Sequence, residues 1–420
     1  MSNGASKHPC TYSTPQEAQG SSQRSIAALK GLKAAMTSVL LQRKYGLEAQ
    51  EAVINIDHAQ LFFMSVLLNT IDPEGEAISL SSKGTHAYDK YFKNTDLHNQ
   101  TGSLYRAAAT KIYRCVDGRK FHLHGSMNPE PTQNSLGLPH EMDARTPEAS
   151  WTPYAGKTSA KRPLAGLKIV DLTRITAAPA VTRGLAELGA SVMRVTAEHV
   201  TDMRGSRDLV RDADVVVQGY RPGMLNKYGF SPGGLLELTK NRERGLIFVR
   251  ENCYGWHGPW SYRNGWQQIS DANCGMSMVF GRAMGDDEPI TPVFPNSDYC
   301  TGIPGIVAVL NALRRGSEGG SYKVDVALKY YSQWLVNSVG VYPHDVWDDV
   351  WTCNGRQMLK ANAGDVVLKP EFFEKRHSGA IGKDVLCIKP IIQYPNGKVE
   401  LKYNVGTRGT EWLRRSGQRI

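Results

Sequence analysis

The chain has 420 residues, 41% of them hydrophobic, and a formal net charge of +10. This composition is typical of a globular protein, and the length allows two or three domains with a sizeable core. No apolar run approaches the roughly 20 residues of a membrane span, and the polar segment 1–25 lacks the apolar centre of a secretory signal. We therefore expect no membrane association and read segment 1–25 as a flexible arm.

The cysteines and the positive charge narrow the class of ligand. The seven cysteines are odd in number and form no C-x-x-C pair, which argues against a disulfide framework and against a bound metal. A basic chain suits a polyanionic small molecule such as a nucleotide or coenzyme A, although a merely basic surface explains the charge as well. No dense basic stripe carries interleaved aromatic residues, so we expect no nucleic acid.

The N-terminal part contains a segment that the chain repeats. Residues 40–63 and 312–335 both predict an apolar helix, basic residues, a turn containing glycine, a strand with alternating apolar positions and an aromatic-rich helix. Nothing before residue 40 matches the strands that begin the second copy, so the first copy is incomplete. Further on, 113–125 predicts a hairpin around Asp117-Gly118.

The C-terminal part opens with a βαβ pattern. A buried strand at 166–173 precedes a helix at 177–190, with a proline near its start and a glycine near its end, and 191–196 is a second strand. Two more buried strands follow at 212–220 and 245–255. The pattern predicts an α/β fold with a Rossmann-like parallel sheet. The turn after the first strand reads RITAAP, without the glycine fingerprint of an NAD(P)-dependent enzyme.

One carboxylate stands out in TPVFPNSDYCTGIPG, residues 291–305. Asp298 lies among prolines and glycines before an apolar helical run, which predicts a stiff turn at the mouth of a helix. Such an aspartate either caps the helix or presents a reactive carboxylate at its positive end. The neighbouring thiol of Cys300 is a second candidate nucleophile, which we rank below Asp298 because buried structural cysteines are common.

Four motifs in order resemble the class III CoA-transferase family (CaiB/BaiF type), which includes formyl-CoA transferase, carnitine CoA-transferase and α-methylacyl-CoA racemase. PLAGLKIVDLTRITAAPAVTRGLAELGASVMRV resembles the family's opening, and ADVVVQGYRPGMLNKYGF its next motif. CYGWHGPWSYRNGW is similar to its Gly-x-x-Gly-Pro segment, and the sequence from NSDYCTG onward to its catalytic-aspartate stretch. YRCVDGRKFHLHG resembles the motif of its small α+β domain. The incomplete first copy suggests a fungal-type tandem member.

The resemblance implies an acyl-CoA:carboxylate CoA-transferase whose nucleophile is the matching Asp298. Its carboxylate attacks the acyl-CoA carbonyl, the released CoA thiolate gives an aspartyl-CoA thioester, and an acceptor carboxylic acid then takes the CoA. Acyl-CoA is thus a substrate, and no cofactor is bound permanently. We expect contacts to CoA from residues at the strand ends and in the turns that follow them, namely Thr176, Ala177, Arg194, Tyr220, Arg221 and Lys227.

The resemblance leaves two other functions open. The racemase branch needs a histidine where this chain has Trp266, so Trp266 and Gln268 are expected to line an acyl pocket instead. A non-catalytic CoA-binding remnant is the other alternative, because the first copy is incomplete. Family members are interlocked dimers, which implies a homodimer or an intramolecular pseudo-dimer. We expect a cytoplasmic location, with mitochondria and peroxisomes also open.

The predicted organisation divides the chain into five segments. The flexible arm is followed by a partial first copy with a small domain, a linker rich in proline, serine and threonine, a Rossmann-like CoA-transferase domain and a C-terminal segment that completes the fold. Their bounds are 1–25, 26–127, 128–162, 163–340 and 341–420.

Overall fold

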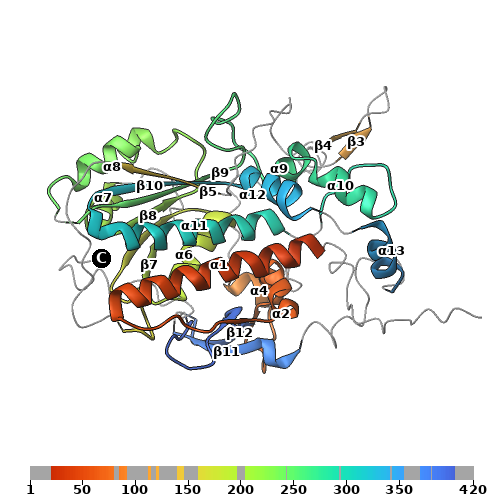
Figure 1. Ribbon diagram of the computed structural model, residues 1–420, viewed down its shortest axis with the longest axis horizontal. Helices are drawn as coiled ribbons and strands as arrows, with labels where there is room; N and C mark the ends of the chain where they lie inside the picture. The colour runs from red at the N-terminus through yellow and green to blue at the C-terminus, as the bar shows by residue number, and fades with distance from the viewer. Residues whose placement is uncertain are drawn as a thin grey trace, which may run out of the picture.

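A six-stranded sheet forms the centre of the molecule, seen here in a computed structural model (Figure 1). Five strands are parallel and one edge strand is antiparallel, in the order β5-β10-β9-β8-β6-β7. The predicted α/β class with a Rossmann-like sheet is confirmed. The strands are β5 (His140–Arg145), β6 (Lys168–Leu172), β7 (Ser191–Arg194), β8 (Val215–Gln218), β9 (Ile247–Asn252) and β10 (Ser321–Ala327). The structure describes residues 20–79, 85–91, 112–114, 120–122, 140–145, 159–195, 204–242, 244–292, 295–340, 343–353, 369–379 and 381–402.

The parallel strands are apolar runs because both faces of the sheet are covered. Along β6, Ile169 points into the core on one face, and Val170 and Leu172 point into the core on the other. Along β8, Val217 points into the core on the same face as Ile169, and Val216 points into the core on the other face. Helices α6 (Ala177–Ala186) and α11 (Asn296–Arg314) cover the first face, whereas α7 (Arg204–Asp212) and α8 (Pro232–Thr239) cover the second (Figure 1).

Helices α6 and α11 approach each other closely at glycines. A Cβ added to Gly302 would lie 2.5 Å from the Cβ of Ala180, and one added to Gly184 would lie 2.0 Å from Cδ1 of Ile306. Side chains at these positions would push the helices apart. The second contact lies four residues further along both helices than the first. The helices therefore run parallel, and their N-termini lie side by side.

The first copy lies against the second. Helix α1 (Gly20–Tyr45) packs along α11, and its first residues, 20–25, belong to the segment predicted as a flexible arm. The order predicted for 40–63 is present: α1 ends before Gly46, and a short strand and helices follow. These elements are β1 (Val53–Ile54), α2 (Ile56–Gln60), the 3-10 helix η2 (Leu61–Met64) and α3 (Ser65–Leu68).

Strands from the two ends of the chain pair with each other. Antiparallel pairs join β1 to β13 and β2 to β12, and β12 also pairs with β11 in a three-stranded sheet. The N-terminal part and the C-terminal segment thus build the small α+β domain together. Its elements are β2 (Thr70–Ile71), the 3-10 helix η7 (Pro370–Phe372), β11 (Phe373–Ser378), β12 (Lys383–Ile388) and β13 (Ile392–Gln393).

Two predictions concern segments that are described only in part. The segment predicted as a linker, 128–162, contains β5, which pairs with β10 as the antiparallel edge of the central sheet. The predicted hairpin is present in the pairing of β3 (Ile112–Arg114) with β4 (Lys120–His122). Backbone pairing of β5 needs only an open sheet edge, which explains why its unremarkable sequence gave no strand signal.

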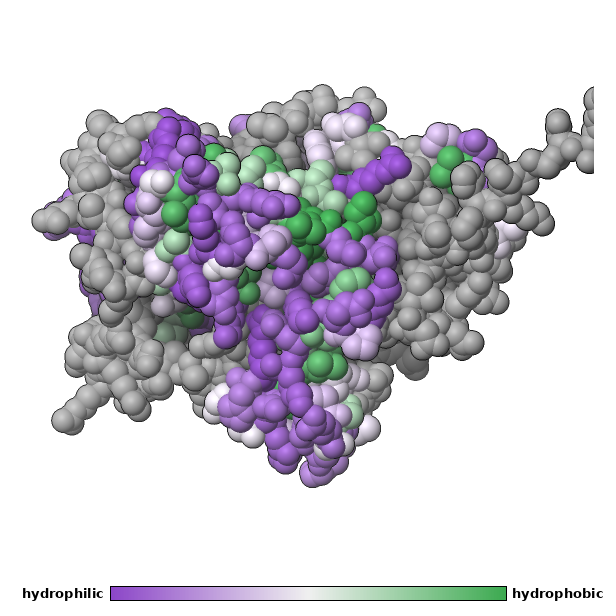
Figure 2. Space-filling model, turned by 60° about the horizontal axis from the view of Figure 1, so that its bottom comes forward, coloured by the Kyte–Doolittle hydropathy of each residue, from purple (hydrophilic) through white to green (hydrophobic). Residues whose placement is uncertain are grey.

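The remaining helices lie around the central sheet and the small domain. Among the helices of the described ranges, none is long and apolar enough to cross a membrane. The face that comes forward in Figure 2 is mostly hydrophilic over its described residues. These helices are α4 (His86–Tyr91), η4 (Asn226–Tyr228), α9 (Gln267–Asn273), α10 (Met276–Ala283), η5 (Arg315–Glu318), α12 (Leu328–Trp334), the π-helix η6 (Leu335–Val339) and α13 (His344–Cys353).

Candidate active site

The strand order places a ligand site at one end of the sheet. Numbered along the chain, the five parallel strands follow the order 2-1-3-4-5, so the direction of winding changes between β6 and β8. Ligands of open α/β sheets bind at such a switch point, beyond the carboxyl ends of the strands. Here Thr176 occupies the N-cap position of α6, Ala177 is buried behind it, and the N–H of Gly219 donates to the carbonyl of Leu172 at 3.3 Å.

Asp298 lies in the first turn of α11 beside this switch point. The helix begins at Asn296 and its N-cap is Pro295, so the prediction of a separate turn before the helix is wrong. Pro304 lies inside the helix, at a point where α11 packs closely on α6 through neighbouring glycines. Glycine and proline usually indicate a turn, but here the glycines allow α11 to pack closely on α6, so the sequence pattern was misleading.

The carboxylate of Asp298 does not cap the helix. No described residue donates a hydrogen bond to this carboxylate, although the side chain is half-buried. Burial, together with the negative charge of Asp271, raises the pKa of Asp298 to about 7. A carboxylate without hydrogen-bond donors in a poorly hydrated site is a stronger nucleophile than a solvated one, because less solvation has to be removed before it attacks.

Asp271 on α9 supports this turn of α11. Its Oδ1 accepts hydrogen bonds from Ser297 Oγ at 3.0 Å and from Ser332 Oγ at 3.1 Å, and its Oδ2 accepts one from Gln267 Nε2 at 3.0 Å. Burial raises the pKa of Asp271 to about 6, against these three donors. The network joins α9, α11 and α12 next to Asp298, and so fixes the start of α11.

Glu251, near the end of β9, is a third carboxyl group in the same region and is buried like Asp271. Its side chain reaches the end of β8, where its Oε2 lies 3.2 Å from the position that a Cβ of residue 219 would occupy. Burial, and after it the charge of Asp298, raises the pKa of Glu251 to about 8. Three acidic groups therefore share one poorly hydrated region.

The residues predicted for the acyl pocket begin α9. Trp266 occupies the N-cap position of this helix and is 41% exposed, so it is not a core residue. Its carbonyl accepts a long contact from the Cys253 thiol at 3.6 Å, which ties it to the loop after β9. Gln268 follows in the first turn and is half-buried. Both residues lie on the helix that carries Asp271.

The residues predicted to contact CoA divide into three groups. Thr176 and Ala177 are at the N-terminus of α6, next to the start of α11. Tyr220, directly after the switch-point strand β8, packs against the core under α7 and α8. The remaining three predicted residues are exposed, and no described contact joins them to Asp298. Arg194 is the last residue of β7, Arg221 lies in the loop after β8, and Lys227 lies in η4.

The surroundings of Cys300, the second candidate nucleophile, differ from those of Asp298. Cys300 is fully buried, its thiol donates to Asn296 Oδ1 at 3.1 Å, and burial raises its pKa to about 12. A thiol of this kind stays protonated and is a poor nucleophile. Within the described ranges, no cluster of three or more metal-ligating side chains occurs.

A polar pocket of about 250 Å³ lies elsewhere, on the small domain. Its charged side chains pair among themselves, with Lys383 Nζ 2.7 Å from Asp72 Oδ2 and with Lys375 bound to Glu74. Paired charges on an open surface offer little to a ligand. The pocket is therefore a weaker candidate than the switch point.

Two groups of the site were missed from the sequence. Glu251 is part of the apolar run GLIFVRENCYG, and Asp271 belongs to QISDANCG. The signal for Glu251 was an acidic residue in a strand whose other residues are buried except for the half-buried Arg250, which is costly without a functional or structural reason. Asp271 offered no such signal, because an acidic residue in a short helix is commonly exposed.

A doubly wound α/β sheet with carboxyl groups beside its switch point is the fold and the candidate site, and comparison with known proteins identifies the class. The CoA-transferase family III profile matches residues 201–348. The chain is 39% identical to the acetyl-coenzyme A transferase nodX of Hypoxylon pulicicidum, over 92% of this chain and 83% of that protein. It is 32% identical to an acyl-CoA transferase of Gibberella moniliformis, over 58% of this chain and 51% of that protein.

The chain belongs to CoA-transferase family III. The predicted family and the predicted enzyme class, a CoA-transferase, are therefore confirmed. Among solved structures, a CAIB/BAIF family protein from Brucella suis is similar, with a TM-score of 0.38 and 25% identity over 42% of this chain and 56% of that one.

Proposed function

We propose that the protein transfers CoA from an acyl-CoA to a carboxylic acid through a covalent intermediate on Asp298. The observation that carries the proposal is the position of Asp298. Its carboxylate accepts no hydrogen bond from a described residue and lies where the N-termini of α6 and α11 meet at the switch point. The positive ends of two helix dipoles favour the negative charge that develops on the acyl oxygen.

The reaction follows from these groups in two exchanges. The Asp298 carboxylate attacks the thioester carbonyl, the C–S bond breaks, and an acyl-aspartyl anhydride and a CoA thiolate form. The thiolate then attacks the aspartyl carbonyl, which releases the acid of the donor and leaves an aspartyl-CoA thioester. The acceptor acid regenerates Asp298 by the same steps in reverse. CoA is a substrate throughout.

The surrounding residues suggest where the substrate lies. Thr176 and Ala177 would meet the thioester end of CoA, and Trp266 and Gln268 would line the acyl group. The exposed cations beyond the strand ends suit the phosphates of CoA. These cations are Arg194, Arg221 and Lys227, with Tyr220 between them and the core.

We infer one active site from the pairing of the two copies. Helix α1 of the first copy packs along α11 of the second. The sequence of α1, GSSQRSIAALKGLKAAMTSVLLQRKY, contains no acidic residue. The first copy therefore has no counterpart of Asp298. It would serve as the structural half of a pseudo-dimer, with a homodimer as the alternative assembly.

The test is CoA transfer from acetyl-CoA, the thioester that the name of the nodX relative contains, to a panel of carboxylic acids. We expect formation of the acceptor's thioester, followed by chromatography, without exchange of the substrate α-proton in deuterated water. Proton exchange without transfer would identify a racemase instead. Tight CoA binding without either reaction would identify a non-catalytic remnant.

A further inference from the structure

The carboxyl group of Glu251 lies in the candidate site but has no role in the transfer steps proposed above. Glu251 is only 8% exposed, near the end of β9. Its Oε2 reaches the backbone of Gly219, at a point where a Cβ would also meet the Cβ of Ala178 at 3.0 Å. The side chain thus extends from β9 across the end of β8 to the first turn of α6. The absence of a side chain at residue 219 leaves the room it occupies.

No described residue satisfies this carboxyl group. No hydrogen bond from a described residue reaches it, and the neighbouring ends of β6 and β8 present the uncharged Thr173 and Gly219. From α11, it faces Asp298, and the Cys253 thiol lies on the loop after β9. A buried, unpaired polar group aimed into a site is costly to keep unless it meets a ligand there.

The charges nearby favour the neutral form of Glu251. Asp298 adds a negative charge on one side, and Asp271 acts on Asp298 and on Cys253. The ammonium group of Lys329 on α12 acts on Cys253 and Cys274, whereas no described ammonium group acts on Glu251 or Asp298. Two buried carboxylates without a cation do not ionise together, so one of them retains a proton.

On the basis of the proposed transfer reaction, we propose that Glu251 stands as a neutral carboxylic acid beside Asp298 and donates a hydrogen bond to the carbonyl oxygen of the bound acyl-CoA. As Asp298 forms its bond to the carbonyl carbon, the C=O electron pair moves to this oxygen. The Glu251 O–H then stabilises the charge. When the C–S bond breaks, the electron pair leaves with the CoA thiolate. The proton stays on Glu251 throughout.

The protonation state can be measured without turnover. The experiment is an NMR titration of the protein labelled with ¹³C-glutamate, with Glu251→Gln to assign the resonance. Glu251 should be protonated at neutral pH and ionise near pH 8. Its titration should move to lower pH in Asp298→Asn, where the neighbouring negative charge is gone. A carboxylate already ionised well below neutral pH would overturn the proposal.

Two substitutions separate hydrogen bonding from charge. Gln keeps a donor of similar shape, so CoA transfer by Glu251→Gln should fall by up to about tenfold, and its decline above about pH 8 should disappear. Leu removes the donor, so transfer by Glu251→Leu should fall by about 10²- to 10³-fold. The matched control is Glu237→Leu, on the exposed surface of α8, which should leave the rate unchanged.

Binding gives a second readout that needs no transfer activity. In an Asp298→Asn background, acetyl-CoA is compared with S-ethyl-CoA, a thioether that lacks the carbonyl oxygen. Glu251→Leu should weaken binding of acetyl-CoA and leave binding of the thioether nearly unchanged. Equal weakening of both ligands, or of neither, would overturn the role of Glu251. A protein without CoA-transfer activity would refute the proposed function, and this comparison would still decide the role of Glu251.

Discussion

Asp298→Asn should lower the rate of CoA transfer by about 10³-fold or more, with the protein still folded. The amide oxygen has nearly the shape of the carboxylate oxygen but is not a nucleophile, so no covalent intermediate can form. Folding should survive, because no described hydrogen bond to the carboxylate is lost. Steady-state transfer rates and melting temperatures measure the two effects.

The raised pKa of Asp298 predicts how the transfer rate and the stability of the wild type change with pH. The pKa of Asp298 is raised to about 7, so transfer by the wild type should increase as pH rises through about 7 and the carboxylate forms. The folded state holds this proton more tightly than the unfolded chain, so stability should fall as pH rises from about 4 to about 7. Asp298→Asn should remove this part of the slope.

Asp286→Asn is the matched control, because Asp286 is exposed in the loop after α10. It should keep both the rate and the pH profile of the wild type. A rate for Asp298→Asn close to that of this control would contradict the role of Asp298. A melting temperature far below that of the control would mean that the lost activity reflects unfolding.

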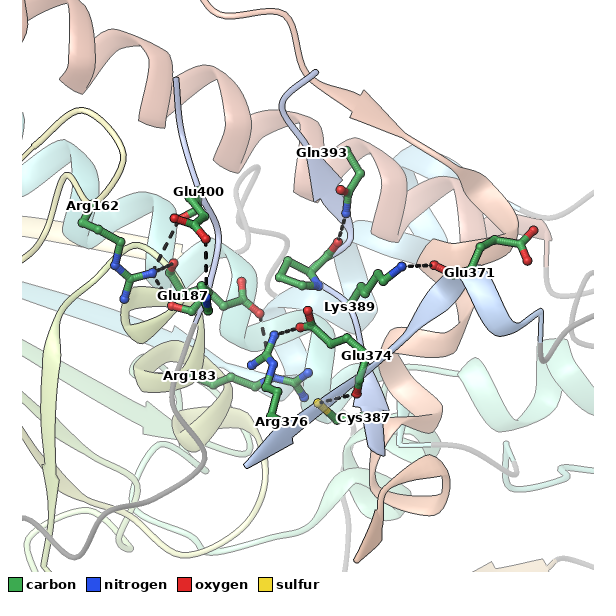
Figure 3. A network of polar contacts seen from close by, with 12 residues as sticks. Arg162, Arg183, Glu187, Glu371, Glu374, Arg376, Cys387, Lys389, Gln393 and Glu400 are labelled. Carbon is green, nitrogen blue, oxygen red and sulfur yellow. Dashed lines mark hydrogen bonds and ion pairs between the residues drawn. The ribbon is translucent and has the colours of Figure 1, made fainter. Parts of the chain in front are cut away.

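Glu187→Leu should lower the free energy of unfolding by about 3–5 kcal/mol. Glu187 ends α6 and lies 2.7 Å from Nζ of Lys33 on α1, with both side chains almost fully buried. Arg183 lies beside the same carboxylate (Figure 3), with its Nε 3.8 Å from Oε1 of Glu187, and Lys30 is buried close by. Without Glu187, the ammonium groups of α1 would be left in the core without a counter-charge.

The pKa values of this cluster set the pH range of its contribution. Burial opposes the charge of Glu187, yet Lys33, Lys30 and Arg183 together lower its pKa to about 2. Burial lowers the pKa of Lys30 to about 7. Because the folded pKa of Glu187 is depressed, its stabilisation is present above about pH 4.5 and is lost as pH falls through about 2.

Urea unfolding of single and double variants tests the buried pair. Glu187→Leu combined with Lys33→Met removes both charges, and it should recover much of the stability lost in the single variant. Glu237→Leu removes one partner of the exposed Lys240–Glu237 pair and should have an effect near zero. A Glu187→Leu variant as stable as this control would show that α1 does not depend on the ion pair.

The sequence predicted best those parts of the fold that local physics determines. The strands β6, β8 and β9 are apolar runs buried on both faces, and they were found from that pattern. Helix α1 was missed over most of its length because its buried face carries Lys30 and Lys33, and the counter-charge of Lys33 is Glu187 on another helix. Long-range pairing of this kind leaves no periodic signal in the chain.

The candidate site shows the same division. Asp298 was found through the order of motifs around it, although Pro304 and the glycines near it were misread as a turn because their contact with α6 is tertiary. Glu251 was missed because only the sheet order brings the end of β9 to the first turn of α6. A residue whose role depends on a neighbouring strand cannot be recognised from its own segment.

The most direct test of the account is to trap the covalent intermediate. The protein is incubated with acetyl-CoA and an acceptor acid, quenched with hydroxylamine and analysed by peptide mass spectrometry, with Asp298→Asn alongside. We predict a hydroxamate on Asp298, dependent on the acyl-CoA and absent from the variant. Turnover without this adduct, or a hydroxamate on another carboxyl group such as Glu251 or Asp271, would contradict the central claim.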